Sequence, residues 1–406
     1  MSWNCCGPGG TGAEHRHNLL RISCESAKAA QELTAAFWAS VSSRPKRLAV
    51  YVNPAGGTGR ALALYEQEVQ PLVRLAGASA VVSVTRHQGH AVELASSLDP
   101  QQFDAVVVVS GDGLLHEVYN GLCQNPHQPA AAWLPLAIIP AGSGNAFARS
   151  LAALSLERNS CTNAALAVLT CQAASTLDVA VVHQLGLQRP MRSLLSLSWG
   201  LVADIDIESE YLRFLGGSRF TVQAIVRVAS LRRYSGVLIF QPPPGTKSVG
   251  DRHATAQEMS LAAEIGVADS GDNSWYALDG PFDSFWALNV AWGGETVLAA
   301  PHAVPNDGCF DLVVVRNGSA LDIAGVLIAF DDGGHIEHGC VTVVKATAFV
   351  LTPGSPLDCS SAGVVVLDGE KVATCTETGA LPLRYAAVGV RVQQGAARIL
   401  TRKPRK

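Results

Sequence analysis

The feature that most constrains this sequence is the stretch Val106–Val118, which reads VVVVSGDGLLHEV. Its four consecutive valines are the length of one buried β-strand, and Leu114, Leu115 and Val118 then recur at helical spacing. The stretch therefore predicts a buried strand, a tight Gly-Asp-Gly turn and a helix. Open α/β sheets bind ligands at this end of their strands. An ordinary strand–turn–helix with a capping aspartate is the alternative interpretation.

Strands and helices alternate around this stretch. Further expected strands are Arg47–Val52, Ala80–Thr85 and Leu136–Pro140, and the expected helices are Ala61–Leu75, Gly89–Leu98 and Ala146–Leu154. This alternation predicts an α/β domain with a mostly parallel, layered sheet.

The pattern changes after about residue 173, where strand-like runs follow one another. These runs are Leu177–Val182, Leu194–Trp199, Gly236–Gln241, Phe285–Ala291, Phe310–Val315, Val341–Val344, Ala348–Leu351 and Gly363–Leu367. Helical stretches intervene near Arg219–Leu231 and Ala320–Phe330, and Pro242–Gln257 and Asp269–Ser284 are expected to be loops. We therefore expect a β-rich, sandwich-like C-terminal domain.

Four segments are expected along the chain. Residues 1–45 form a tail with a candidate helix at Glu25–Val41, residues 46–172 the α/β domain, residues 173–397 the β-rich domain and residues 398–406 a basic tail.

Composition narrows the function classes. The formal net charge of −4 gives no support for a nucleic-acid partner. Neither an uninterrupted transmembrane-length apolar run nor a signal peptide is visible, so a cytoplasmic protein with reduced cysteines is expected. Acylation of the Cys5-Cys6 pair remains open, although a disordered tail is favoured.

Three glycine-containing turns follow three of the expected strands: Asn53–Arg60, Ser110–Gly113 and Gly142–Asn145. They should lie along one edge of the sheet. Glycine lets the backbone approach an anion, and each following helix presents free N–H groups. The three turns predict a nucleotide phosphate site. It is not a P-loop, because the Lys-Ser/Thr ending is missing.

A carboxylate in a phosphate site needs an explanation, because the two anions repel. Asp112 could hold Mg²⁺, or it could take a proton from a substrate hydroxyl as the γ-phosphoryl group moves. Both roles fit phosphoryl transfer to an alcohol. Arg213 and Arg219 are candidates for contacting phosphates, although surface charges are the simpler interpretation.

These motifs together resemble the diacylglycerol-kinase-type lipid kinases, and among them the sphingosine kinases. The resemblance rests on Asn53-Pro54 with its glycine loop, Ser110–Gly113 with His116-Glu117-Val118, Pro140–Asn145, Leu195–Gly200, Ala203–Glu210 and Leu367–Glu370. It runs in segments from about Arg47 to Val390.

The resemblance implies roles at the matching positions. Asp112 would be the general base, with Ser110, Gly111 and Gly113 beside it at the substrate, and Asp206 would pair with a lipid amine. The residues implied to contact ATP are Asn53, Pro54, Ala55, Thr85, Arg86, His87, Gln88, Gly89, Glu117, Gly142, Ser143, Gly144, Arg213, Arg219, Asp368, Gly369 and Glu370. Mg²⁺ is expected with the ATP, with its ligands unassigned beyond Asp112 and the Asp368–Glu370 segment.

The acidic run Asp204–Glu208 bears on the lipid. If it is a strand, its alternating side chains place three carboxylates on one face. Such a face attracts the ammonium of a sphingoid base, whereas diacylglycerol has no amine and the ceramide nitrogen is a neutral amide. A solvated strand face is the alternative.

We therefore predict an ATP-dependent kinase that converts a sphingoid base to its 1-phosphate, in peripheral contact with a membrane surface. A diacylglycerol or ceramide kinase, a soluble NAD kinase and a catalytically silent lipid-binding module are the alternatives. The oligomeric state stays open, with a dimer among the options. His87, His90 and His116 lack metal-type spacing and are read as surface or surrounding groups.

Overall fold

The structure is a computed structural model that describes residues 45–57, 59–171, 173–185, 189–246, 250–268, 274–354, 363–372 and 387–402. The expected helix Glu25–Val41 and the Cys5-Cys6 pair lie outside these residues.

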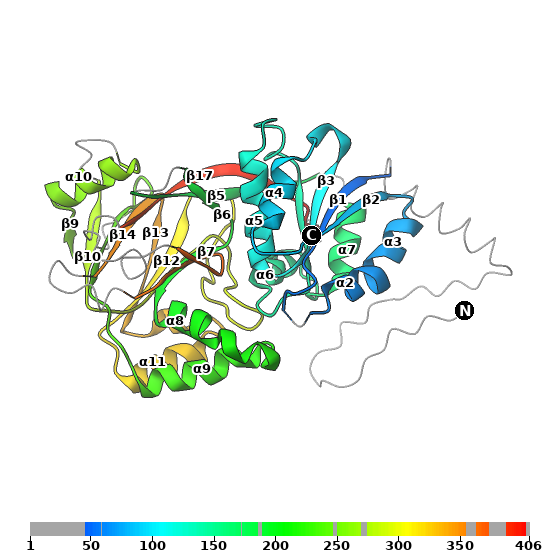
Figure 1. Cartoon of the computed structure of the whole chain (residues 1–406). Helices are drawn as coiled ribbons and strands as arrows, with labels where there is room; N and C mark the ends of the chain where they lie inside the picture. The colour runs from blue at the N-terminus through cyan, green and yellow to red at the C-terminus, as the bar shows by residue number, and fades with distance from the viewer. Residues whose placement is uncertain are drawn as a thin grey trace.

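The N-terminal unit is a parallel sheet covered by helices on both faces (Figure 1). Its strands and helices are β1 (Arg47–Val52), α2 (Ala61–Leu64), η1 (Tyr65–Val69), α3 (Gln70–Leu75), β2 (Ser79–Val84), α4 (His90–Ser96), η2 (Pro100–Gln102), β3 (Ala105–Ser110), α5 (Asp112–Gln124), β4 (Leu136–Pro140), α6 (Ala146–Leu154) and α7 (Cys161–Thr170). Strands β2, β1, β3 and β4 pair in parallel in that order, as the α/β alternation predicts. Helices α4, α5 and α6 share one core with the sheet, and α2, η1, α3 and α7 share the core on the other face.

Two details of this unit differ from the prediction. The expected helix Ala61–Leu75 contains a π-helical turn, η1, just before Pro71. Proline has no N–H and crowds the preceding turn, which accounts for the irregularity. Helix α7 was not predicted, and its N-terminus is capped by the Ser160 side chain, which accepts a hydrogen bond from the Asn163 N–H.

The C-terminal unit is rich in antiparallel strands, as predicted. Its elements are β5 (Ser175–Gln184), β6 (Met191–Ser193), β7 (Ser196–Gly200), α8 (Leu201–Glu208), η3 (Ser209–Leu215), α9 (Ser218–Ala229), β8 (Gly236–Gln241), β9 (Arg252–His253), α10 (Ala256–Ile265), β10 (Tyr276–Asp279), β11 (Phe282–Leu288), β12 (Phe310–Arg316), α11 (Ala320–Ala329), η4 (Gly334–Glu337), β13 (Val341–Ala346), β14 (Ala348–Pro353), β15 (Val365–Leu367), β16 (Glu370–Val372) and β17 (Val388–Ile399). The loop prediction for Asp269–Ser284 is wrong where β10 and the start of β11 occupy it, because these short strands bury apolar side chains such as Leu278 and Phe282.

A six-stranded sheet, β13-β12-β11-β7-β15-β16, supports the part of this unit that faces the α/β unit. Helices α8, α9 and α11 lie together below it in Figure 1 and share a core with β11 and β12. Among the described residues, no helix combines the length and apolar character needed to cross a bilayer.

The long strand β17 joins the two units. It pairs with β5 and β14 over most of its length, and at Ile399 it pairs in parallel with Leu136 of β4, so one eleven-stranded sheet runs through both units. Figure 1 shows this strand in red crossing from one unit to the other. The expected basic tail therefore begins inside the sheet, and Arg402 pairs with Glu157 at 2.6 Å. Residues 403–406 lie outside the described chain.

Candidate active site

The three glycine turns meet at one edge of the parallel sheet. A Cβ atom on Gly142 would lie 2.4 Å from the Cα of Gly111, and one on Gly57 would lie 2.8 Å from the Gly142 backbone. Only glycine fits where the backbones touch. The prediction that the turns share one edge is confirmed.

These turns form one end of a cleft of about 2190 Å³ between the two units. Of the residues predicted to act in nucleotide or lipid binding, all line this cleft except Gly89 and Arg213. Gly89 begins helix α4 with a positive φ of 80°. Arg213 lies in η3, and its side chain is outside the described part of the chain.

Asp112 is the first residue of α5, and its carboxylate points at a second helix. One oxygen accepts the Ala146 N–H at 2.9 Å and the other accepts the Phe147 N–H at 3.0 Å, both at the start of α6. Burial raises the pKa of the Asp112 carboxyl to about 6, and these two backbone hydrogen bonds oppose the shift. The aspartate therefore caps a helix, as the simpler interpretation held, but the capped helix is α6 and not the helix that Asp112 itself begins. Each oxygen has a second lone pair that can accept a hydroxyl proton.

The Asp368-Gly369 pair forms the two-residue turn of the β15–β16 hairpin. Both residues have positive φ, 51° and 88°, as a type I′ turn requires. The Asp368 carboxylate is 2% exposed and accepts hydrogen bonds from Ser193 Oγ and from the N–H groups of Leu194, Leu195 and Ser196. His116 also contacts this carboxylate, so both oxygens of Asp368 bind groups within the protein.

His116 supplies the link from the α/β unit to this hairpin. It lies one helical turn after Asp112 on α5, and its Nδ1 is 3.0 Å from the Asp368 carboxylate. Burial would lower the pKa of His116, but the hydrogen bond and charge of Asp368 raise it above its usual value. His116 was predicted to be either a surface group or a group surrounding the site. The surface alternative is wrong, because the His116 side chain is 12% exposed. Its spacing from Asp112 was the signal available in the sequence.

The next residue of the hairpin, Glu370, turns toward Gln88 and the second glycine turn. Its carboxylate accepts a hydrogen bond from Gln88 Nε2 at 3.1 Å, and it faces Gly113, whose added Cβ would lie 3.1 Å from Oε1. Burial raises the pKa of this carboxyl. Glu370 is thus a cleft-facing oxygen ligand, the kind that Mg²⁺ prefers, whereas Asp368 is not free to bind a metal.

The acidic run predicted as a possible strand face is helix α8, so the prediction of three carboxylates on one face is wrong. Asp204 accepts a hydrogen bond from the Tyr234 hydroxyl at 2.6 Å, and Glu208 pairs with Arg227 at 2.6 Å, both away from the cleft. Asp206 lies on the other side of the helix and lines the cleft. Residues two positions apart point to different sides of a helix, whereas in a strand they share one face.

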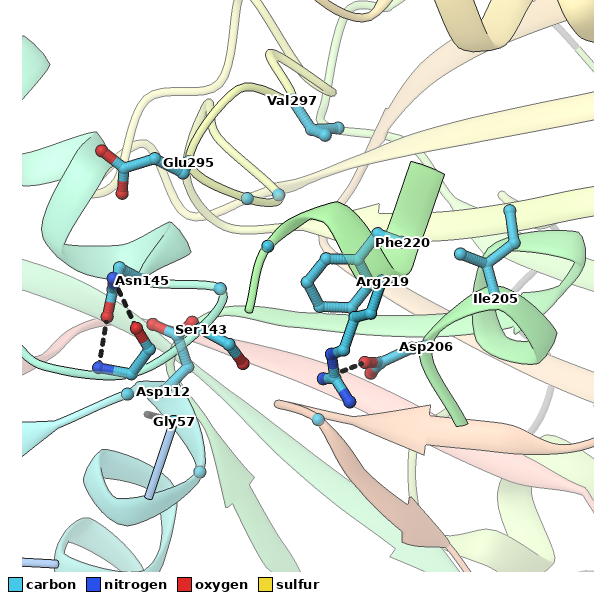
Figure 2. Close-up of a pocket in the computed structure, with 18 of the residues that line it drawn as sticks. Gly57, Asp112, Ser143, Asn145, Ile205, Asp206, Arg219, Phe220, Glu295 and Val297 are labelled. Atoms are coloured by element: carbon cyan, nitrogen blue, oxygen red, sulfur yellow. Dashed lines mark hydrogen bonds and ion pairs between the residues drawn. The ribbon is translucent and has the colours of Figure 1, made fainter. Parts of the chain in front are cut away.

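Asp206 has an arginine beside it. Figure 2 shows the Arg219 guanidinium facing Asp206, with Nη2 3.7 Å from Oδ1, and Arg219 also pairs with Glu210. Burial raises the pKa of the Asp206 carboxyl to about 6; Arg219 opposes the shift, and Glu210, Asp112 and Glu370 add to it. Asp206 and Asp112 thus share one electrostatic environment.

The opposite end of the cleft is apolar, and most of its lining residues were not predicted from the sequence. Figure 2 shows Ile205, Phe220 and Val297 around this end. Further apolar lining residues are Val202, Ala224, Ile225, Val228, Trp286, Leu321, Leu327 and Ile328. Helical apolar residues of this kind cannot be told from ordinary core residues by spacing alone.

One other group of potential metal ligands occurs at the cleft margin. One ligand atom from each of His87, His90 and Glu93 lies within 4.8 Å of the others. The search for spacing with nearby Cys or Asp did not indicate this group, because its third member is Glu93, three residues after His90.

Comparison with known proteins agrees with this geometry. The family model of the diacylglycerol kinase catalytic domain matches residues 47–182, and the YegS C-terminal NAD kinase beta sandwich-like domain matches residues 284–396. A crystal structure of a diacylglycerol kinase from Bacillus anthracis is similar with a TM-score of 0.54 and 18% identity, covering 88% of this chain and 97% of that one. That likeness shows the fold.

Closer sequence relatives are sphingosine kinases. The chain is 37% identical over 372 residues to sphingosine kinase 1 of Arabidopsis thaliana, covering 88% of this chain and 76% of that protein. It is 36% identical over 338 residues to sphingosine kinase 1 of Homo sapiens, covering 80% and 86%. This chain therefore belongs to the sphingosine kinase family and carries a diacylglycerol kinase catalytic domain.

Proposed function

We propose that this protein transfers the γ-phosphoryl group of ATP to the primary hydroxyl of a sphingoid base, giving the sphingoid 1-phosphate and ADP. The observation that carries the proposal is the two-ended cleft. Glycine turns fit for phosphates form one end, apolar side chains form the other, and Asp112 and Asp206 lie on the lining that connects them.

Asp112 is the proton acceptor in this proposal. As the lipid oxygen forms its bond to the γ-phosphorus and the bond to the β-phosphate oxygen breaks, the hydroxyl proton passes to the Asp112 carboxylate. A pKa of about 6 suits this role, because the group is ionised at neutral pH yet more basic than an ordinary aspartate. The N–H groups of Ala146 and Phe147 hold the carboxylate in place.

Asp206 selects the lipid. Its carboxylate lies between the catalytic aspartate and the apolar end, where the ammonium of a sphingoid base would follow its hydroxyl group. A neutral diacylglycerol or ceramide would bring no cation to this carboxylate. The charge at this position therefore favours a free amine over the two alternative lipids.

The nucleotide would bind against the glycine turns, with Mg²⁺ held by Glu370 and the phosphate oxygens. Bound Mg²⁺ neutralises charge on the β- and γ-phosphates. The His116–Asp368 pair fixes the hairpin that presents Glu370, so it positions this ligand without touching the reacting atoms.

Peripheral membrane contact is part of the proposal. Ile225, Leu321 and Ile328 line the cleft and are 67%, 85% and 74% exposed, so its apolar end opens among uncovered apolar side chains on α9 and α11. A lipid could pass from a bilayer into this opening without crossing water.

A lipid-panel assay with radiolabelled ATP tests the proposal. Wild-type protein should phosphorylate sphingosine well above diacylglycerol and ceramide, and Asp112→Asn should abolish the signal for all three. A preference for diacylglycerol or ceramide would reassign the substrate, and phosphorylation of NAD alone would reject a lipid kinase.

A further inference from the structure

Arg219 is predicted to hold nucleotide phosphates, yet in the structure it binds carboxylates on the lipid side. The arginine is 5% exposed, and its guanidinium pairs with Glu210 and lies 3.7 Å from Asp206. It also stacks over the Phe220 ring, 4.4 Å from the centroid. Its Nε has no hydrogen-bond partner, so the guanidinium is held by charge more than by a complete set of hydrogen bonds.

The position of Arg219 conflicts with the proposed lipid. The ammonium of a sphingoid base would need the Asp206 carboxylate that Arg219 now faces, and two cations on one carboxylate repel each other. When no lipid is bound, Arg219 supplies the positive charge beside Asp206. Its guanidinium lies 3.7 Å from the carboxylate and opposes the increase in the Asp206 pKa that Glu210, Asp112 and Glu370 produce.

Helix α9 starts beside the phosphate end of the cleft. A Cβ on Gly217 would lie 3.8 Å from the Ser143 carbonyl oxygen in the third glycine turn, and Arg219 follows two residues later. From its place on α9, the Arg219 side chain can therefore point either to Asp206 or to the phosphate end of the cleft, depending on its rotamer.

We propose that Arg219 substitutes for the substrate ammonium at Asp206 in the lipid-free enzyme, and that the arriving ammonium releases it toward the nucleotide phosphates. The inference rests on the proposed function and adds a coupling to it. An amine-bearing lipid would strengthen nucleotide binding, whereas a neutral lipid would leave Arg219 in place. Selectivity would then come partly from activation, and not only from lipid affinity.

The test measures nucleotide affinity in the presence of lipids that cannot react. The probes are a sphingoid analogue that lacks the 1-hydroxyl but keeps the amine, and its N-acetylated neutral form, each at saturation. In wild-type protein the amine should lower the Kd of a non-hydrolysable ATP analogue with Mg²⁺ by about 5-fold or more, the lower end of typical coupling. The neutral form should change the Kd less than about 2-fold.

Variants separate the coupling from loss of structure. Arg219→Gln and Asp206→Asn should remove the coupling, and Arg219→Lys should retain part of it. Arg232→Gln is the matched control, because Arg232 pairs with Asp204 and Glu208 of the same helix α8 but away from the cleft. It should keep full coupling.

Each outcome has a defined meaning. Equal tightening by the amine and the neutral form, or full coupling in Arg219→Gln, would overturn the inference even if sphingosine is phosphorylated. Failure of wild-type protein to phosphorylate sphingosine in the lipid-panel assay would instead reject the proposed function.

Discussion

The clearest test of the site is Asp112→Asn, for which the structure gives separate expectations for activity and stability. Asparagine cannot accept the substrate proton. General-base catalysis contributes about 10² to 10⁴-fold, so we expect kcat to fall by that factor, equivalent to about 2.7–5.5 kcal/mol in activation free energy.

Stability should change for a different reason. Both Asp112 oxygens accept a backbone N–H, from Ala146 and Phe147. Asparagine has one side-chain acceptor, so its amide would face one of these N–H groups and leave it unpaired. This costs roughly 1–3 kcal/mol, partly offset by removing a charge that burial disfavours. A modest fall in melting temperature is therefore expected with the loss of kcat.

The pH profile distinguishes a general base from a helix cap. With a pKa of about 6 before ATP binds, Asp112 becomes protonated as pH falls, so wild-type kcat/KM for ATP should decline below pH 6. The residual kcat/KM of Asp112→Asn should lack this decline. Steady-state kinetics with varied ATP at saturating sphingosine between pH 5 and 8 measure it, in a window where Tm confirms that both proteins are folded.

Asp99→Asn provides a matched control. Asp99 caps η2 by accepting the Gln101 N–H at 3.0 Å, and it is absent from the cleft lining. The Asp99→Asn variant should be somewhat less stable than the wild type and should have an unchanged kcat. A kcat for Asp112→Asn within 10-fold of wild type would refute the general-base assignment.

The remaining predictions concern the lipid, the hairpin and the membrane. Asp206→Asn should raise the KM for sphingosine at least about 10-fold, which is the effect of losing one good charge pair. The KM for an uncharged lipid alcohol should change little, and steady-state kinetics with both substrates will measure the difference. In wild type the KM for sphingosine should rise below pH 6, because the pKa of Asp206 is raised to about 6 and its protonated form does not attract an ammonium. The pKa of Asp206 is higher in the folded protein than in the unfolded chain. The contribution of Asp206 to the free energy of unfolding is therefore fully present below about pH 3.8 and is lost as the pH rises through 6. Denaturant unfolding at several pH values will check this dependence. His116→Gln removes the imidazole that hydrogen-bonds the buried Asp368 carboxylate at 3.0 Å, and it should cost about 1–3 kcal/mol of unfolding free energy in urea titrations and raise the KM for ATP. The double variant Ile225→Ser, Leu321→Ser should bind vesicles more weakly in a sedimentation assay, because both side chains are exposed and apolar in the wild type. Its kcat on detergent-dispersed sphingosine should stay near the wild-type value. Undiminished vesicle binding would reject this membrane surface.

The α/β unit was predictable because its signals are local. The buried runs of β1, β3 and β4 are continuous, since a parallel sheet covered on both faces places apolar side chains on each side. Each run is followed by glycines at the point where the backbone must turn or approach another backbone. Such a pattern places Asp112 and the glycine turns at one edge without knowledge of any long-range contact.

The contacts that complete the site are long-range and were not predictable from spacing. His116 and Asp368 are separated by 252 positions, and Gln88 and Glu370 by 282. Their encounter depends on β17 closing the sheet between the two units, a pairing that no local pattern encodes. Asp-Gly at a hairpin turn is a recognisable signal, but it does not say which helix the turn will face.

Helix α8 shows how a correct residue can rest on a wrong element. Alternating acids in Asp204–Glu208 fit a strand as well as any period-two pattern, so three carboxylates on one face were an open interpretation, with a solvated strand face as the alternative. In the helix, Asp204 instead binds Tyr234 and Glu208 binds Arg227, so of these three carboxylates only Asp206 lines the cleft. That separation matters for the chemistry. A cluster of three acids would attract any cation, whereas the proposed exchange of Arg219 for a lipid ammonium needs only one carboxylate of this helix, Asp206, with Arg219 beside it.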